Sequence, residues 1–144
     1  RRSSDLRHQH TVMALGDGGA HYGLICDASY TTHALTYWTR DRQGERWPLA
    51  WTVRQLTDVP ARTVGLGDRG RLAPGFKADI NVIDLDRLAV AAPHPVHNLP
   101  GGGRRLEQKA QGYRATIVGG DVTYRDGTFT GALPGRLVRG ARGL

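Results

Sequence analysis

The sequence has 144 residues, of which 39% are hydrophobic, and a formal net charge of +7 at pH 7. That length suffices for one domain with a hydrophobic core, but it is too short for a TIM barrel, which takes roughly 200 residues or more. No apolar run reaches the roughly 18 residues of a membrane-spanning helix. The single cysteine excludes an internal disulfide and a multi-cysteine zinc site.

The positive charge comes mostly from arginines that are scattered along the chain. Nucleic-acid-binding domains gather basic residues in one patch or along one helix. The sequence shows no such cluster. We therefore expect neither a nucleic-acid partner nor a membrane partner, and we expect the protein in the cytoplasm.

The beginning of the chain is unusual for a complete protein. It starts with Arg1 and Arg2, and the only methionine, Met13, lies inside the first apolar run. We therefore expect the sequence to be the C-terminal piece of a longer protein.

The first predicted element is a strand over residues 11–15. A short apolar run that ends on glycines is typical of a strand buried on both faces, as in a parallel sheet. Asp17 follows it, between Gly16 and Gly18, at the strand end where parallel α/β folds place their chemistry. Asp17 is thus a candidate functional residue, with a turn cap as the alternative.

Three helices are predicted next. Apolar residues recur at helical spacing over about 30–38, after Asp27 or Ser29 as the capping residue. Pro48 suits the first turn of a second helix. A short third helix is predicted over residues 58–64.

The hydrophobic period becomes strand-like in the second half. Residues 79–84 alternate between apolar and polar, which indicates a half-buried strand. Residues 113–118 and 121–125, separated by two glycines, predict a β-hairpin. Residues 91–103 are rich in proline and glycine and are expected to form an irregular loop.

These elements predict an α/β protein in two parts, residues 1–66 and residues 67–144. Asp79 and Asp84 flank the first strand of the second part, and we interpret both as strand-edge and turn-capping residues. His8 and His10 have the spacing of a metal-binding pair, but no third ligand lies nearby in the sequence. We interpret them as surface residues.

A set of motifs along the chain resembles one enzyme superfamily. The motifs are GDGGAH at 16–21, ICDAS at 25–29, WTRD at 38–41, TDVPAR at 57–62, GRLAPG at 70–75, NLPGGGRR at 98–105 and GALPGR at 131–136. In this order they resemble the amidohydrolase superfamily, and within it the N-acyl-D-amino-acid deacylase family (D-aminoacylase-like, amidohydrolase 3).

The resemblance implies an architecture and a cofactor. The family folds as a metal-dependent (β/α)8 barrel with a small β-sandwich built from both chain ends. Residues 1–66 would then supply the last barrel strand and the helices after it, and residues 67–144 part of the sandwich. The zinc ligands of the family lie mostly upstream of this chain, so Asp17 is the only metal contact that the resemblance allows here.

The resemblance also implies site residues. Asp17 matches the last-strand aspartate, which serves the family as the general acid and base, and His21 is a candidate substrate contact in the loop that follows. Related sequences commonly have Ser-Asp where this chain has Gly16-Asp17, a change that we expect to loosen the site without changing the reaction.

The expected function is therefore hydrolysis of a non-peptide C–N bond in a small molecule, with an N-acyl-D-amino acid as the substrate. The rest of the barrel would be the chain's main partner, and we expect these 144 residues alone to be inactive. A basic nucleic-acid-binding domain and a structural β-domain without catalysis are the alternatives. The acyl group, the amino-acid side chain and the choice between an amide and a cyclic amide do not follow from this part of the sequence.

Overall fold

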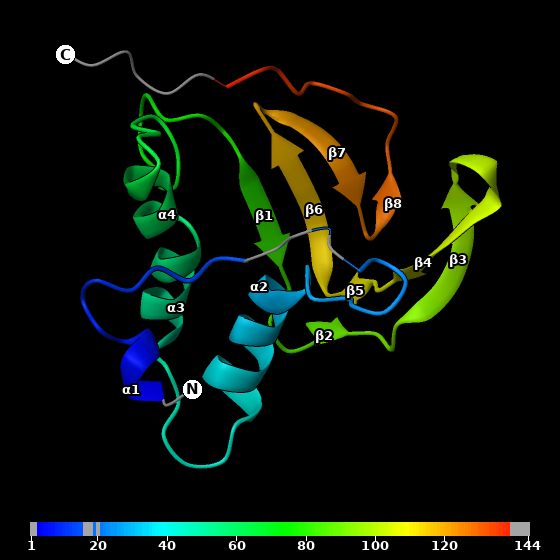
Figure 1. Ribbon diagram of the computed structural model, residues 1–144. Coiled ribbons are helices and arrows are strands. Elements are labelled where there is room, and N and C mark those ends of the chain that lie inside the picture. The colour runs from blue at the N-terminus through cyan, green and yellow to red at the C-terminus, as the bar shows by residue number, and fades with distance from the viewer. Residues whose placement is uncertain (1–2, 16–18, 20, 139–144) are drawn as a thin grey trace.

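The computed structural model describes residues 3–15, 19 and 21–138 (Figure 1). Its helices are α1 (Ser3–Leu6), α2 (Tyr30–His33), the π-helix η1 (Ala34–Asp41), α3 (Leu49–Leu56), α4 (Asp58–Thr63) and the 3-10 turn η2 (Pro100–Gly102). Its strands are β1 (Ile80–Ile83), β2 (Ala89–Val90), β3 (His94–Leu99), β4 (Gly103–Glu107), β5 (Ala110–Gln111), β6 (Tyr113–Val118), β7 (Asp121–Arg125) and β8 (Thr128–Phe129).

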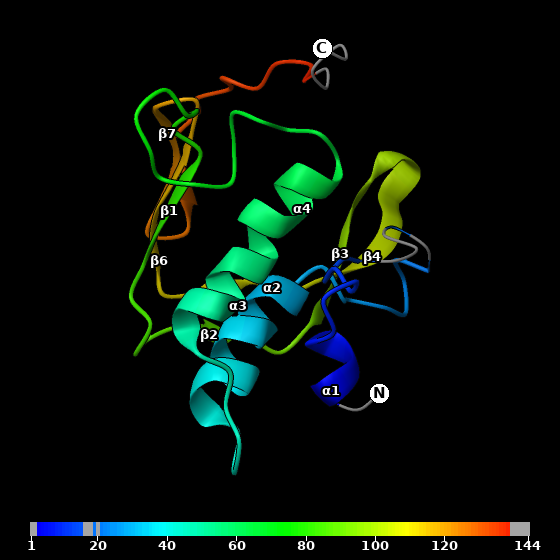
Figure 2. The same ribbon diagram turned by 90° about the vertical axis from the view of Figure 1, so that its left-hand side faces the viewer.

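The main sheet is antiparallel and has the order β1-β6-β7-β8. Helices α2, α3 and α4 lie against one face of it, as Figure 2 shows. Strands β2 and β5 form a two-stranded ribbon, and so do β3 and β4. Every strand pair in the described part of the chain is antiparallel. No helix there has the length and apolar character needed to cross a membrane.

The predicted hairpin of the second half is confirmed. Strands β6 and β7 pair from Ala115 opposite Arg125 to Val118 opposite Asp121. Two glycines with φ of 60° and 96° make the turn, because this tight connection needs a left-handed backbone. The predicted strand over 79–84 is also present, as β1.

The predicted helices are present as well, and they supply three of the buried hydrophobic side chains among the described residues, Ala34, Leu35 and Ala61. The first helix runs through α2 into the eight-residue π-helix η1. Thr39 Oγ1 donates to the carbonyl of Ala34 at 3.1 Å, five residues back.

Trp47 is almost fully buried and stacks on Trp38, with ring centroids 4.5 Å apart. The helical part thus packs around an aromatic pair.

The strand predicted over residues 11–15 is not formed. This segment has no strand partner in the described structure and takes an irregular path. A strand buried on both faces needs neighbouring strands on both edges, and the strands of the second half pair with one another instead.

The irregular loop expected over residues 91–103 is instead largely a β-hairpin. Strand β3 pairs with β4, with His94 opposite Glu107 and Val96 opposite Arg105. Pro95 is tolerated there, since a two-stranded ribbon leaves each strand with one unpaired edge on which a missing N–H costs little. The proline and glycine content of residues 91–103 led to the prediction of a loop, which is wrong for most of this segment.

Arg40 joins the helices to the strands. Its guanidinium donates to the carbonyls of Leu85 and Leu88, the latter at 2.9 Å. Leu88 is fully buried, and the backbone of Gly112 packs directly against it. A Cβ atom at Gly112 would lie 2.7 Å from the Cα of Leu88, and φ at Gly112 is +92°.

This close approach predicts that Gly112→Ala destabilises the chain by about 1–3 kcal/mol more than Gly120→Ala, because overpacking adds to the backbone strain. Gly120 is a matched control, with φ of +96° and no atom within 4 Å of the added Cβ. Urea denaturation followed by tryptophan fluorescence measures both. Equal losses would mean that the contact with Leu88 relaxes without cost.

Candidate active-site segment

The predicted catalytic residue Asp17 lies outside the described residues. The segment after it is described from Gly19 and His21 onward. His21 has a φ of 54°, in the left-handed region that non-glycine residues seldom adopt. Its carbonyl accepts the backbone N–H groups of Leu24 at 2.7 Å and Ile25 at 2.9 Å. A tight turn therefore begins at the predicted substrate contact.

Two hydrogen bonds connect this turn to strand β4. The N–H of Leu106 donates to the carbonyl of Tyr22 at 2.8 Å. The Nη2 atom of Arg104 donates to the carbonyl of Gly23 at 3.3 Å. The segment that follows Asp17 thus lies along the free edge of the β3–β4 hairpin, where a third strand would lie.

The turn presents exposed side chains. His21 is exposed, and so are Tyr22, Leu24 and Ile25, with Leu24 at 79%. Large apolar side chains that lie exposed together are typical of a surface that another part of a protein covers.

The described residues do not build a metal centre. Within residues 3–15, 19 and 21–138, no three His, Cys, Asp or Glu side chains lie together in a way that could hold a metal ion. The rings of His8 and His10 lie 5.4 Å apart on the surface, but no third ligand from the described part of the chain joins them. A complete zinc site therefore does not fit the described residues alone.

Asp79 and Asp84 cap turns, as the sequence predicts. Asp79 Oδ1 accepts the backbone N–H of Gly119 at 2.8 Å. Asp84 Oδ1 accepts the N–H of Arg87 at 3.2 Å, and its Oδ2 pairs with Arg114 at 3.0 Å. The Arg87 hydrogen bond and the Arg114 guanidinium hold the pKa of Asp84 below its usual value.

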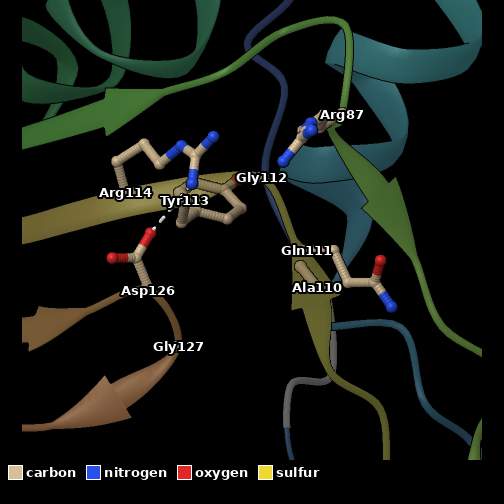
Figure 3. A pocket seen from close by; sticks show the side chains of 8 residues that line it. All are labelled: Arg87, Ala110, Gln111, Gly112, Tyr113, Arg114, Asp126 and Gly127. Carbon is tan, nitrogen blue, oxygen red and sulfur yellow. Dashed lines mark hydrogen bonds and ion pairs between the residues drawn. The ribbon is translucent and has the colours of Figure 1, made fainter.

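One pocket of about 600 Å³ opens beside β5, β6 and the β7–β8 turn. Figure 3 shows the Arg114 guanidinium directed at the Asp126 carboxylate, with Arg87 across the pocket. Arg114 is paired with both Asp84 and Asp126, and these carboxylates raise its pKa. Its charge is therefore already balanced, so the pocket offers little to a ligand.

A second pocket, of about 710 Å³, lies between the helices and the main sheet. Asp58 lines it and is only 7% exposed. Its carboxylate faces three arginines, with Arg62 at 2.8 Å, Arg54 at 3.5 Å and Arg71 at 3.7 Å. Burial works to raise the pKa of Asp58, but the hydrogen bonds and charges of these arginines outweigh it, so the pKa is lowered.

Comparison with known proteins identifies the family. The profile described as "Amidohydrolase family" matches residues 4–124. The chain belongs to the amidohydrolase family. The family implies a (β/α)8 barrel and is generally metal-dependent. The described residues of this chain form a small α/β structure with few helices and several strands.

Three relatives illustrate the range of the family. The chain is 40% identical over 62 residues to N-acyl-D-glutamate deacylase from Alcaligenes xylosoxydans xylosoxydans, which is 43% of this chain and 13% of the relative. It is 30% identical over 94 residues to D-aminoacylase from the same organism, covering 64% and 17%. It is 30% identical over 114 residues to dihydroorotase from Lactobacillus acidophilus, covering 78% and 26%.

The chain thus spans between about an eighth and a quarter of the length of these relatives. No solved structure matches it significantly. The family match and the two deacylase-type relatives confirm the resemblance to the D-aminoacylase-like amidohydrolases.

Sequence reasoning missed the part that β4 plays at this segment. The signal that could have found it is the glycine run before Arg104, which lies between apolar Val96 and Leu106. Glycines between two apolar segments indicate a hairpin. The prolines of residues 91–103 indicated a loop instead, and the loop became the prediction.

The three arginines around Asp58 predict a pH-dependent effect of Asp58→Asn. Because the folded-state pKa is lowered, the stabilisation is present above the unfolded-state pKa of about 3.9 and is lost as the pH falls through the folded-state pKa. The variant should therefore melt at a lower temperature than the wild type at pH 7. This difference in melting temperature should become smaller at pH 3 and below. Circular dichroism melts at several pH values measure it.

Asp68→Asn is the control, since the exposed Asp68 carboxylate faces a single arginine, Arg69 at 3.6 Å, among the described residues. Such surface pairs contribute little, so this variant should melt close to the wild type throughout. A gap for Asp58→Asn that stays constant with pH would show that the carboxylate charge does not stabilise the fold.

Proposed function

We propose that this chain is the C-terminal part of a zinc-dependent amidohydrolase that cleaves the amide C–N bond of an N-acyl-D-amino acid. The family match over residues 4–124, which include Asp17, carries the proposal. The substrate class is supported by the names of two relatives, N-acyl-D-glutamate deacylase and D-aminoacylase.

In this proposal residues 11–15 are the last strand of the barrel, and residues 67–144 belong to the small β-sandwich. The irregular path of residues 11–15 agrees with this assignment, because the barrel strands that would flank them are not part of these 144 residues. The exposed apolar side chains of the turn after His21 would then be covered by the upstream barrel.

Asp17 would move the proton in the reaction. A water oxygen attacks the amide carbon, the C–N bond breaks, and the departing amine needs a proton. A carboxylate can accept the proton from the water and pass it to the leaving nitrogen. Zinc, when bound, lowers the pKa of water and polarises a carbonyl, and its ligands would come mostly from upstream residues. His21 would contact the substrate.

Dihydroorotase is the name of a relative whose match covers 78% of this chain. This match supports dihydroorotate hydrolysis as a second candidate function. The two candidates predict different substrates for one protein, so a single set of assays separates them.

The first test uses the complete gene product. The reading frame upstream of Arg1 should encode a barrel-length extension of roughly 200 residues or more, with an H-x-H motif near its start. The purified protein should hydrolyse N-acetyl-D-amino acids, with product amine measured by chromatography. A stop codon shortly before Arg1 would contradict the proposal, and turnover of dihydroorotate alone would favour the second candidate.

A substitution tests the role of Asp17 in the complete gene product. Asn keeps one acceptor oxygen but cannot take up a proton at neutral pH. General acid–base catalysis typically contributes about 10²–10⁴-fold, so Asp17→Asn should lower kcat at least about a hundredfold with the metal content unchanged. Asp79→Asn, at a turn of the main sheet, should leave kcat nearly unchanged. If Asp17→Asn kept a third of the wild-type kcat, Asp17 would be a turn cap.

The 144 residues alone should have no hydrolase activity. No three potential zinc ligands lie together in the described part of the chain, so the isolated chain should bind zinc no more tightly than stray histidines do. Metal analysis after gel filtration and an assay with N-acetyl-D-amino acids check this. One tightly bound, chelator-sensitive zinc with turnover would disprove it.

A further inference from the structure

Arg104 lies on β4 beside the segment that follows Asp17. Its Nη2 atom donates to the carbonyl of Gly23 at 3.3 Å, in the turn that begins at His21. The neighbouring hydrogen bond from Leu106 to the Tyr22 carbonyl fixes β4 against the same turn. The position of the Arg104 guanidinium is therefore tied to the predicted substrate contact.

Two other cations, one on β4 and one just after it, are already paired. Arg105 donates to Asn98 Oδ1 at 2.8 Å and to Glu107 at 3.1 Å, and Lys109 lies 3.6 Å from Glu107. Arg104 differs, because it is exposed and makes no ion pair within residues 3–15, 19 and 21–138. One donor reaches Gly23, which leaves most of the five N–H groups of a guanidinium for a ligand.

We propose that Arg104 binds the carboxylate of the amino-acid part of the substrate. The inference rests on the proposed function, since an N-acyl amino acid carries one carboxylate beside the amide that is cleaved. A guanidinium binds a carboxylate with two parallel hydrogen bonds, which fixes the orientation as well as the charge. Arg104 would in this way orient the scissile amide relative to Asp17.

The pairing of Arg104 with a carbonyl rather than a carboxylate suits this role. The contact with Gly23 orders the side chain without neutralising it, so the full charge is left for the substrate. The arginine of the pocket in Figure 3 shows the contrast, because Arg114 has two carboxylate partners, Asp84 and Asp126.

The test compares two non-hydrolysable ligands of the complete gene product. N-methanesulfonyl-D-leucine carries the carboxylate, and N-methanesulfonyl-D-leucinol has a hydroxyl in its place. Isothermal titration at pH 7 should show the acid binding at least about tenfold more tightly to the wild type, as a hydrogen-bonded charge pair requires. Arg104→Gln should remove this preference, and Arg104→Lys should keep part of it because the charge remains without the planar fork.

Arg105→Gln is the matched control. It removes the neighbouring guanidinium, which holds the hairpin together, so any structural damage should weaken both ligands equally and leave the preference intact. A purely structural role of Arg104 would give the same pattern for Arg104→Gln and would overturn the proposal. A wild type that binds acid and alcohol equally would overturn it as well.

The two proposals fail in different ways. If the complete gene product hydrolyses no N-acyl-D-amino acid but prefers the acid through Arg104, the proposed function is wrong and the carboxylate site stands. If the protein hydrolyses these substrates and Arg104→Gln retains the full preference for the acid, the proposed function stands and the role of Arg104 is wrong.

Discussion

The structure depends on one arginine that donates hydrogen bonds both to a carboxylate and to backbone carbonyls. Arg40 pairs through Nε and Nη2 with the carboxylate of Asp41 at 2.6 and 2.9 Å, and through Nη1 with carbonyls of the turn that precedes β2. The hydrogen bond from Arg40 lowers the pKa of Asp41. Because the helix end and the turn share one guanidinium, the helices cannot shift along the strands without breaking several hydrogen bonds. Leu88, in the turn that Arg40 binds, is fully buried.

Two side-chain bridges extend this junction toward the candidate site. Ser29 donates to Gln108 Oε1 at 2.6 Å, and Gln108 donates to the carbonyl of Ala91 at 2.9 Å. Thr32 and Tyr113 share a hydrogen bond of 2.9 Å between their hydroxyls. Because these bridges fix the start of α2 against the strands, the turn that begins at His21 lies at β4. The part of the chain expected to carry chemistry is therefore positioned by the part expected to be structural.

The sequence predicted the elements whose signals are local. The glycine turn between β6 and β7 and the alternation in β1 depend on neighbouring residues, so they could be recognised without a structure. The prediction of a strand over residues 11–15 failed because strand pairing is not a local property, and in the described residues the strands of the second half pair with one another instead. The β3–β4 hairpin was missed because proline on an unpaired edge looks the same in a sequence as proline in a loop. The place of Arg104 could not be predicted, since its contact with Gly23 joins residues 81 positions apart.

That separation has a consequence for the order of events during synthesis. The turn at Gly23 leaves the ribosome well before the strand that secures it, since Arg104 comes 81 positions after Gly23. At about 5–20 residues per second, translation leaves the turn without this support for roughly 4–16 s. During that interval its exposed Tyr22, Leu24 and Ile25 are open to misfolding and to chaperones. The turn after His21 therefore gains this support late, although it is made before the strand that provides it.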